Sequence, residues 1–211
     1  MSLWGRIFAA AYDTCMAGPE KAVLRGHRRA LLARVRGRVL EIGGGTGANL
    51  PFYGSGIEEL VITEPDESMA RRLERKLGDY SLPTRVVRAP AEELPFEDEG
   101  FDFVVSTLVL CTVDDPARAL AQIHRLLKPD GQLLFVEHVR SDEPRLARWQ
   151  DRLHGLQLRV GRGCHCNRKT LESINAAGFS IPELDHDKLR KAPPIMRPLI
   201  VGAAERVSAA P

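Results

Sequence analysis

The chain has 211 residues and an ordinary globular composition, 44% hydrophobic and 27% charged, which predicts one domain with at most small additions. Its net charge of +2 and its lack of nucleic-acid-binding signatures give no reason to expect a DNA or RNA partner. Four unevenly spaced cysteines are too few for a disulfide scaffold, and no run of about 18 apolar residues occurs, so we expect a cytoplasmic protein.

Residues 1–36 are predicted to form an N-terminal helical cap. Apolar side chains recur at helical spacing over 2–16, Gly18-Pro19 is expected to break that helix, and a second, arginine-rich helix is expected to follow. We interpret this as an amphipathic helix pair that packs on a sheet and covers a ligand. One alternative stays open: the first helix contacts a membrane surface weakly through Trp4 and Phe8, which would make the protein peripheral at the membrane.

The stretch 39–47, Val-Leu-Glu-Ile-Gly-Gly-Gly-Thr-Gly, predicts a strand and a tight turn, and 48–50 resemble the first turn of a helix. This is the opening unit of a Rossmann-like sheet, in which glycines permit positive φ and a close approach of the backbone to a ligand. Glu41, two residues before the first glycine, would repel a pyrophosphate. It would suit a ligand that carries an ammonium and a sulfonium, so these residues favour S-adenosylmethionine (SAM) over a dinucleotide.

Strands and helices then alternate as far as residue 138, which predicts a mostly parallel sheet with helices on both faces. Glu64 ends the second strand, roughly 20 residues after the first glycine, the usual distance for an acid that hydrogen-bonds ribose hydroxyls. The predicted strands are 60–63, 85–88, 101–106 with an extension to 113, and 132–136, and the predicted helices are 66–77 and 115–128.

The last third, 141–211, is predicted to form the acceptor side. Cys164-His165-Cys166 lie in a loop there. Zinc needs four ligands in a structural site, and no second Cys or His pair lies at a suitable spacing, so we expect no metal. Two interpretations of the loop stay open: a substrate lid, or a plain turn whose cysteines pack inward. The predicted elements are a helix at 145–160, a loop at 161–168, a helix at 169–177 and strands at 179–185 and 198–205.

Four features occur in order: the acid-plus-glycine loop, the acid after the second strand, Glu-Glu-Leu-Pro-Phe at 92–96, and Leu-Leu-Lys-Pro-Asp-Gly-Gln at 126–132. Together they resemble the class I SAM-dependent methyltransferases of the methyltransferase domain 11 type, the group that includes the quinone C-methyltransferases. A closer resemblance, to the methyltransferase-like thiol S-methyltransferases, extends nearly to the C-terminus. It is carried by residues such as Thr107-Leu108-Val109-Leu110-Cys111, Glu137-His138-Val139 and Gly163-Cys164.

The resemblance implies a single α/β domain over 1–211, built on a Rossmann-like, mostly parallel seven-stranded sheet with helices on both faces. Residues 37–140 would form the SAM-binding core, and an insertion would precede the last two strands. The methionine part of SAM would lie over the glycine loop, the ribose at Glu64 and the adenine beside Ala91 and Glu92. The predicted SAM-binding residues are Glu41, Gly43, Gly44, Gly45, Thr46, Gly47, Asn49, Glu64, Pro65, Ala91, Glu92, Thr107 and Leu108.

The implied reaction is methyl transfer to a small molecule, with the sulfur of a small apolar thiol as the first expectation. The alternatives are a phospholipid amine, a quinone carbon, or a natural-product hydroxyl or amine. A free thiol has a pKa of about 8.5, so a nearby base would raise its thiolate fraction. His138, after the fifth strand, is the predicted base, and a histidine that only shapes the pocket is the alternative. The residues predicted to contact the acceptor are Tyr12, Cys111, His165 and Arg168.

Overall fold

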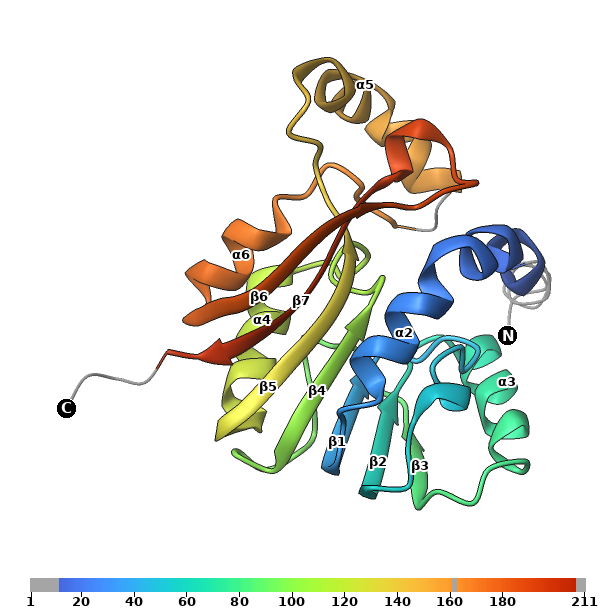
Figure 1. The fold of residues 1–211 in the computed structure, drawn as a ribbon, viewed down its shortest axis with the longest axis vertical. Coiled ribbons are helices and arrows are strands. Elements are labelled where there is room, and N and C mark those ends of the chain that lie inside the picture. The colour runs from blue at the N-terminus through green and yellow to red at the C-terminus, as the bar shows by residue number, and fades with distance from the viewer. Residues whose placement is uncertain (1–11, 161–162, 208–211) are drawn as a thin grey trace.

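A computed structural model describes residues 12–160 and 163–207; the predicted membrane-contacting residues Trp4 and Phe8 lie outside this part. Its centre is a seven-stranded sheet in the order β3-β2-β1-β4-β5-β7-β6 (Figure 1). Strand β7 is antiparallel to both of its neighbours, and the other pairs are parallel. The predicted fold is confirmed. The strands are β1 (Gly37–Ile42), β2 (Ile57–Thr63), β3 (Thr84–Val87), β4 (Phe101–Thr107), β5 (Leu127–His138), β6 (Phe179–Lys188) and β7 (Pro198–Arg206).

Helices cover both faces of the sheet. Successive side chains of a strand point to opposite faces, so a strand with apolar side chains on both faces needs helices on both to bury them. In β1, Leu40 and Ile42 join the core beneath α4 and α6. Val39 joins the opposite core, to which α2 and α3 contribute. The α-helices whose bounds are described are α2 (Arg25–Leu32), α3 (Glu67–Leu77), α4 (Pro116–Leu126), α5 (Pro144–Val160) and α6 (Thr170–Ala176).

The predicted break at Gly18-Pro19 is wrong. Residues 12–19 are helical and continue through the π-helix η1 (Glu20–Leu24) directly into α2. Pro19 itself has helical angles, φ −57° and ψ −42°. Proline lacks one backbone donor, but the wider turn keeps the chain helical beyond it, since the Arg25 N–H donates to the Glu20 carbonyl.

Three other local predictions are wrong. No α-helix follows the glycine loop; residues 45–49 form turns that lead into a 3₁₀-helix, η2 (Leu50–Phe52). Strand β4 ends at Thr107 and does not extend to 113, because Leu108 adopts a left-handed φ of 59°. Strand β5 begins at Leu127, inside the predicted helix 115–128 and before the predicted strand 132–136.

The insertion between β5 and β6 contains α5 and α6, as predicted, and α5 stands beyond one end of the sheet (Figure 1). The buried Gln150 of α5 fastens it there. Its amide nitrogen, with two N–H donors, lies within hydrogen-bond distance of three carbonyl oxygens, those of Val139, Cys166 and Ile195, at 3.1, 2.8 and 3.0 Å. In the described part of the chain, every helix is too short or too polar to cross a bilayer.

Candidate cofactor-binding site

The glycine loop follows β1 at the carboxyl edge of the sheet. Gly43, Gly45 and Gly47 have φ values of +56°, +56° and +82°, which L-residues with side chains rarely adopt. A Cβ atom on Gly43 would lie 2.7 Å from the Val109 side chain. Gly45 is different, because no described atom other than those of its chain neighbours lies within 4 Å of the place its Cβ would take. The loop is therefore tightly packed at Gly43 and open at Gly45.

Two cavities meet at this loop, of about 420 Å³ and about 290 Å³, and Tyr12, Gly43 and Gly45 line both. Among the predicted SAM-binding residues, only Gly47 lines neither. The structure thus brings the others together around two adjoining cavities, and the binding itself stays a prediction. The larger cavity adds Glu64, Pro65, Ala91, Glu92 and Leu108, and the smaller adds Glu41, Gly44, Thr46, Asn49 and Thr107.

Glu64 stands on the wall of the larger cavity and also holds the loop in place. Its Oε2 accepts a hydrogen bond from the Gly45 N–H at 2.8 Å, and its Oε1 accepts one from the Asp66 N–H at 2.9 Å. An ionised carboxylate has about four acceptor sites. Glu64 therefore brings an acceptor carboxylate to the cavity wall, and its predicted contact with ribose hydroxyls stays a prediction.

Glu41 lies on the wall of the smaller cavity and is only 3% exposed. Its carboxylate accepts from Asn49 Nδ2 at 2.9 Å and from the Tyr53 hydroxyl at 2.8 Å. Burial raises the pKa of Glu41 from 4.5 to about 7. Arg28 of α2 donates to the Asn49 side-chain oxygen, which connects the cap to this carboxylate. Neither Tyr53 nor Arg28 was predicted to belong to the site.

The helical cap covers the glycine loop, as predicted. Tyr12 lines both cavities, and burial raises its pKa to about 12. Asp13, which was not predicted, accepts a hydrogen bond from the Thr46 hydroxyl and lies 3.6 Å from Lys76 Nζ. The polar face of the cap helix therefore contacts the loop directly.

Glu92 has a second task besides lining the larger cavity. Its Oε1 accepts from the backbone N–H groups of Asp114 and Asp115 at 2.8 and 3.2 Å. These bonds fix the chain just before α4, so part of the carboxylate is already engaged. The predicted contact between Glu92 and adenine stays a prediction.

Glu137, at the end of β5, is fully buried and organises the loop after β4. It accepts from Ser106 Oγ at 2.7 Å and from the N–H groups of Val109, Leu110 and Cys111 at 3.0, 3.1 and 3.3 Å. Burial raises its pKa. Sequence reasoning placed Glu137 in a motif but missed this role. An acid that ends a buried strand was the available indication.

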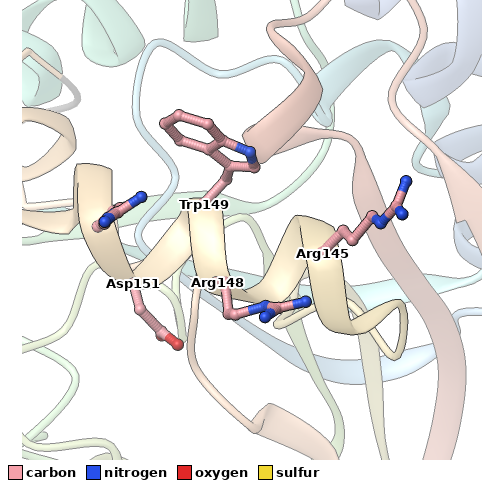
Figure 2. A pocket seen from close by; sticks show the side chains of 5 residues that line it. Arg145, Arg148, Trp149 and Asp151 are labelled. Carbon is pink, nitrogen blue, oxygen red and sulfur yellow. The ribbon is translucent and has the colours of Figure 1, made fainter.

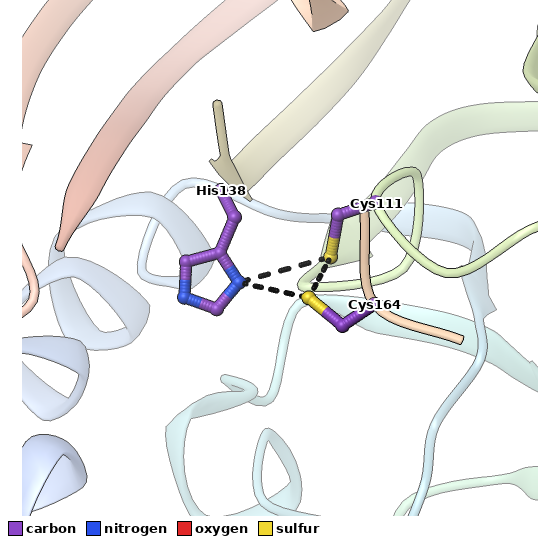
Figure 3. Close-up of side chains that lie close together, drawn as sticks. All are labelled: Cys111, His138 and Cys164. Carbon is purple, nitrogen blue, oxygen red and sulfur yellow. Dashed lines mark hydrogen bonds between the residues drawn. The ribbon is translucent and has the colours of Figure 1, made fainter. Parts of the chain in front are cut away.

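His138, Cys111 and Cys164 point toward one another beside this loop (Figure 3). His138 Nδ1 lies 3.8 Å from the Cys111 sulfur and 3.6 Å from the Cys164 sulfur, and the two sulfurs are 3.6 Å apart. The hydrogen-bonded contacts with Cys111 and Cys166 lower the pKa of the Cys164 thiol, and the same contacts raise the pKa of the Cys111 and Cys166 thiols. The ring of His138 faces sulfur rather than the two cavities, so its predicted role as the base stays untested.

His165 and Arg168, predicted to contact the acceptor, both make hydrogen bonds that hold the loop that carries Cys164. The His165 N–H donates to the Cys111 carbonyl at 2.7 Å, and Arg168 Nη1 donates to the Leu110 carbonyl at 2.7 Å. Neither side chain is among the described residues that line the two cavities. Their predicted contact with the acceptor therefore stays a prediction, as does that of Cys111.

A larger cavity, of about 690 Å³, lies away from the glycine loop on α5 (Figure 2). All of its described lining residues belong to that one helix, and Trp149 is half exposed. A binding site needs polar groups that converge from several elements. We therefore assign the site to the two smaller cavities. The residues of α5 that line the larger cavity are Arg145, Arg148, Trp149, Asp151 and Arg152.

Known proteins are similar to this chain in sequence and in fold. A family model described as a methyltransferase domain matches residues 40–135. The thiol S-methyltransferase TMT1B of Homo sapiens is 30% identical over 197 residues, which cover 86% of this chain and 79% of that protein. The Rattus norvegicus protein of that name is 35% identical over 151 residues, which cover 70% of this chain and 62% of that protein. A SAM-dependent methyltransferase structure from Thermotoga maritima shares the fold, with a TM-score of 0.71 and 24% identity over 95% of this chain and 97% of that one.

Proposed function

The chain belongs to the class I SAM-dependent methyltransferases, and we propose that it transfers a methyl group from SAM to the sulfur of a small apolar thiol. The adjoining cavities at the glycine loop support the choice of SAM as the cofactor. The thiol is inferred as the methyl acceptor from one observation, the similarity to proteins named thiol S-methyltransferases. This similarity extends well beyond the SAM-binding core and covers 86% of this chain.

The residues at the glycine loop fit SAM. The open space at Gly45 leaves room for a ligand against the backbone. Glu64 offers acceptor sites for ribose hydroxyls, and Glu41 offers a carboxylate toward an ammonium group. Met69 and Leu108 add apolar surface to the larger cavity, as a flat adenine ring requires. When bound, SAM supplies an electrophilic methyl group on a sulfonium.

The protein's contribution is to bind, to orient and to exclude water, because in-line methyl transfer depends on how donor and nucleophile are placed. Tyr12 lies where the two cavities meet. Because its pKa is about 12, its hydroxyl stays protonated at neutral pH and can donate a hydrogen bond but cannot take the proton of a thiol. The apolar side chains of Val109 and Val113 favour an acceptor with little charge.

A methyl-transfer assay over matched thiols, amines, phenols and quinols tests the proposal. We expect apolar thiols to give the highest kcat/KM, with S-adenosylhomocysteine formed in equal amount. Amines or quinols as the leading acceptors, with inert thiols, would refute the thiol assignment and leave the family intact.

The cofactor is tested separately by thermal shift. A ligand at 100 times its Kd stabilises a protein by about 2.7 kcal/mol. SAM and S-adenosylhomocysteine should therefore raise the melting temperature, and NAD should leave it unchanged. A shift with NAD alone would contradict the assigned cofactor.

A further inference from the structure

Cys111, His138 and Cys164, hereafter the sulfur cluster, place three ligand atoms on a compact and nearly equilateral triangle (Figure 3). Its edges are 3.6 Å between the two sulfurs, and 3.6 and 3.8 Å from His138 Nδ1 to Cys164 and Cys111. All three residues are buried, at 0%, 3% and 6% exposure. The three groups come from the loop after β4, the end of β5 and the loop before α6, so the fold rather than local sequence assembles them.

This triangle has the size of one face of a zinc coordination tetrahedron. Zn–S bonds of about 2.3 Å and Zn–N bonds of about 2.0–2.1 Å imply edges of about 3.8 Å between sulfurs and about 3.6 Å between sulfur and nitrogen. The observed edges agree with these values to within about 0.2 Å. Two thiolates and an imidazole suit zinc, whereas Mg²⁺ and Ca²⁺ prefer oxygen ligands. We therefore propose that Cys111 Sγ, Cys164 Sγ and His138 Nδ1 bind a zinc ion.

The surroundings hold the ligands in place. The Cys111 N–H donates to the Glu137 carboxylate, and the Cys111 carbonyl accepts from the His165 N–H. Gln150 donates to the carbonyl of Cys166, two residues beyond Cys164. Backbone anchoring of this kind on both sides of the cluster limits the rearrangement that metal binding would require.

Cys166 is not part of the proposed ligand set. Its sulfur lies 3.5 Å from that of Cys164, but it does not belong to the group whose ligand atoms all lie within 4.8 Å of one another. Three protein ligands leave one position of the tetrahedron for water or a small thiol, as zinc sites with an open position do.

Metal analysis of the full chain tests the site without an activity assay, so the result does not depend on the proposed function. The protein is purified without chelator, dialysed with zinc chloride and then freed of excess metal. We expect about one tightly bound zinc per chain in the wild type, and almost none in C111S, C164S or H138A. C15S changes an exposed cysteine outside the cluster and serves as the matched control. It should bind as much zinc as the wild type, and so should C166S.

Cobalt supplies a second readout that reports the ligands themselves. Tetrahedral Co²⁺ with two thiolates gives intense visible bands and a near-ultraviolet thiolate-to-metal band. The near-ultraviolet band should lose about half its intensity in any C111S or C164S sample that retains cobalt, since one of two thiolates is gone. A cooperative thermal unfolding transition shows which variants are folded. If none is, the wild-type zinc content and cobalt spectrum decide alone.

Three results would overturn the proposal. The first is a wild type without bound zinc whose thiols are all free in denaturant. The second is a Cys111–Cys164 disulfide in place of metal. The third is equal zinc in the wild type and in the folded cluster variants, or its loss in C166S, because either would show that the ligands are not the three assigned here.

Discussion

Strands β1 and β5 each have a buried glutamate as their penultimate residue, and the two strands use that carboxylate differently. Glu41, in β1, accepts from the side chains of Asn49 and Tyr53 and lines a cavity. Glu137, in β5, accepts mainly from the backbone N–H groups of residues 109–111. Side-chain donors can turn toward a new partner when a ligand binds, whereas backbone donors cannot do so without moving the chain. The hydrogen-bond donors, and not the residue type, therefore distinguish Glu41, which lines a cavity, from Glu137, which holds the backbone of a loop.

The largest effect should come from removing the scaffold carboxylate. E137A leaves several buried donors unsatisfied, and each costs about 1–3 kcal/mol, so the free energy of unfolding should fall by at least about 3 kcal/mol. Urea denaturation measures it. S106A is the matched control, because it removes one donor to the same carboxylate and should cost only about 1 kcal/mol. Equal losses of unfolding free energy in E137A and S106A would show that Glu137 does not hold the backbone of residues 109–111.

Glu41 should give a pH dependence instead. Its pKa is raised from 4.5 to about 7 in the folded state, so the folded chain holds this proton more tightly than the unfolded chain does. The free energy of unfolding should therefore fall as the pH rises from 4.5 to about 7. At 1.36 kcal/mol per pKa unit the fall is about 3 kcal/mol.

E41Q cannot titrate and serves as the comparison for that measurement. Denaturation of wild type and E41Q should give similar stabilities near pH 4.5, where Glu41 is protonated, and the curves should separate as the pH rises to about 7, because only the wild type loses stability. Parallel curves would mean that Glu41 is not a buried acid of raised pKa, and the contrast with Glu137 would need another basis.

Ligand affinity sharpens the comparison within the glycine-loop side. E64A removes an acceptor on the cavity wall, and a hydrogen bond to a charged group contributes about 1.5–3 kcal/mol. Calorimetry with S-adenosylhomocysteine should show affinity reduced by about 10- to 100-fold. E92A should reduce it less, because Glu92 is predicted only to flank the adenine, whereas Glu64 is predicted to accept ribose hydroxyls. The opposite order would exchange the roles assigned to these two acids.

The smallest effect on stability should appear at Gly45. G45A and G43A impose the same unfavourable φ of +56°, which costs about 1–2 kcal/mol for an L-residue. Only G43A adds a contact of 2.7 Å with Val109. Thermal unfolding should therefore show G45A as the milder change, although its methyl group would enter the cavity and weaken S-adenosylhomocysteine binding. Equal losses of stability would argue that Gly45 is not open to a ligand.

The sequence predicted the glycine-loop side well because its information is local. An apolar run before the glycines predicted β1, and the helix expected from residue 66 corresponds to α3, which Asp66 caps by accepting from the backbone N–H groups of Ser68 and Met69. Arg28, Asp13 and Tyr53 could not be found in the same way. They reach Asn49, Thr46 and Glu41 through packing that no spacing rule records.

The sulfur cluster was missed for a similar reason. The expectation of no metal considered only ligands near Cys164 in the sequence, whereas Cys111 lies 53 residues and His138 26 residues away. The adjacency of β4 and β5 was deducible in part, because neighbouring parallel strands bring their carboxyl ends together. The position of Cys164 in the cluster was not deducible from the sequence, because it depends on how Gln150 fastens α5.

The π turn at Glu20–Leu24 fixes the rotational phase between the two parts of the N-terminal helix. A helix advances about 100° per residue, so deleting one residue from this turn would swing residues 12–19 around the axis by roughly that angle. Tyr12 and Asp13 would swing away from the glycine loop, while Leu32 kept its place in the core. The orientation of residues 12–19 can thus change while α2 stays packed in the core. Deletion of one residue from the π turn is enough to change that orientation.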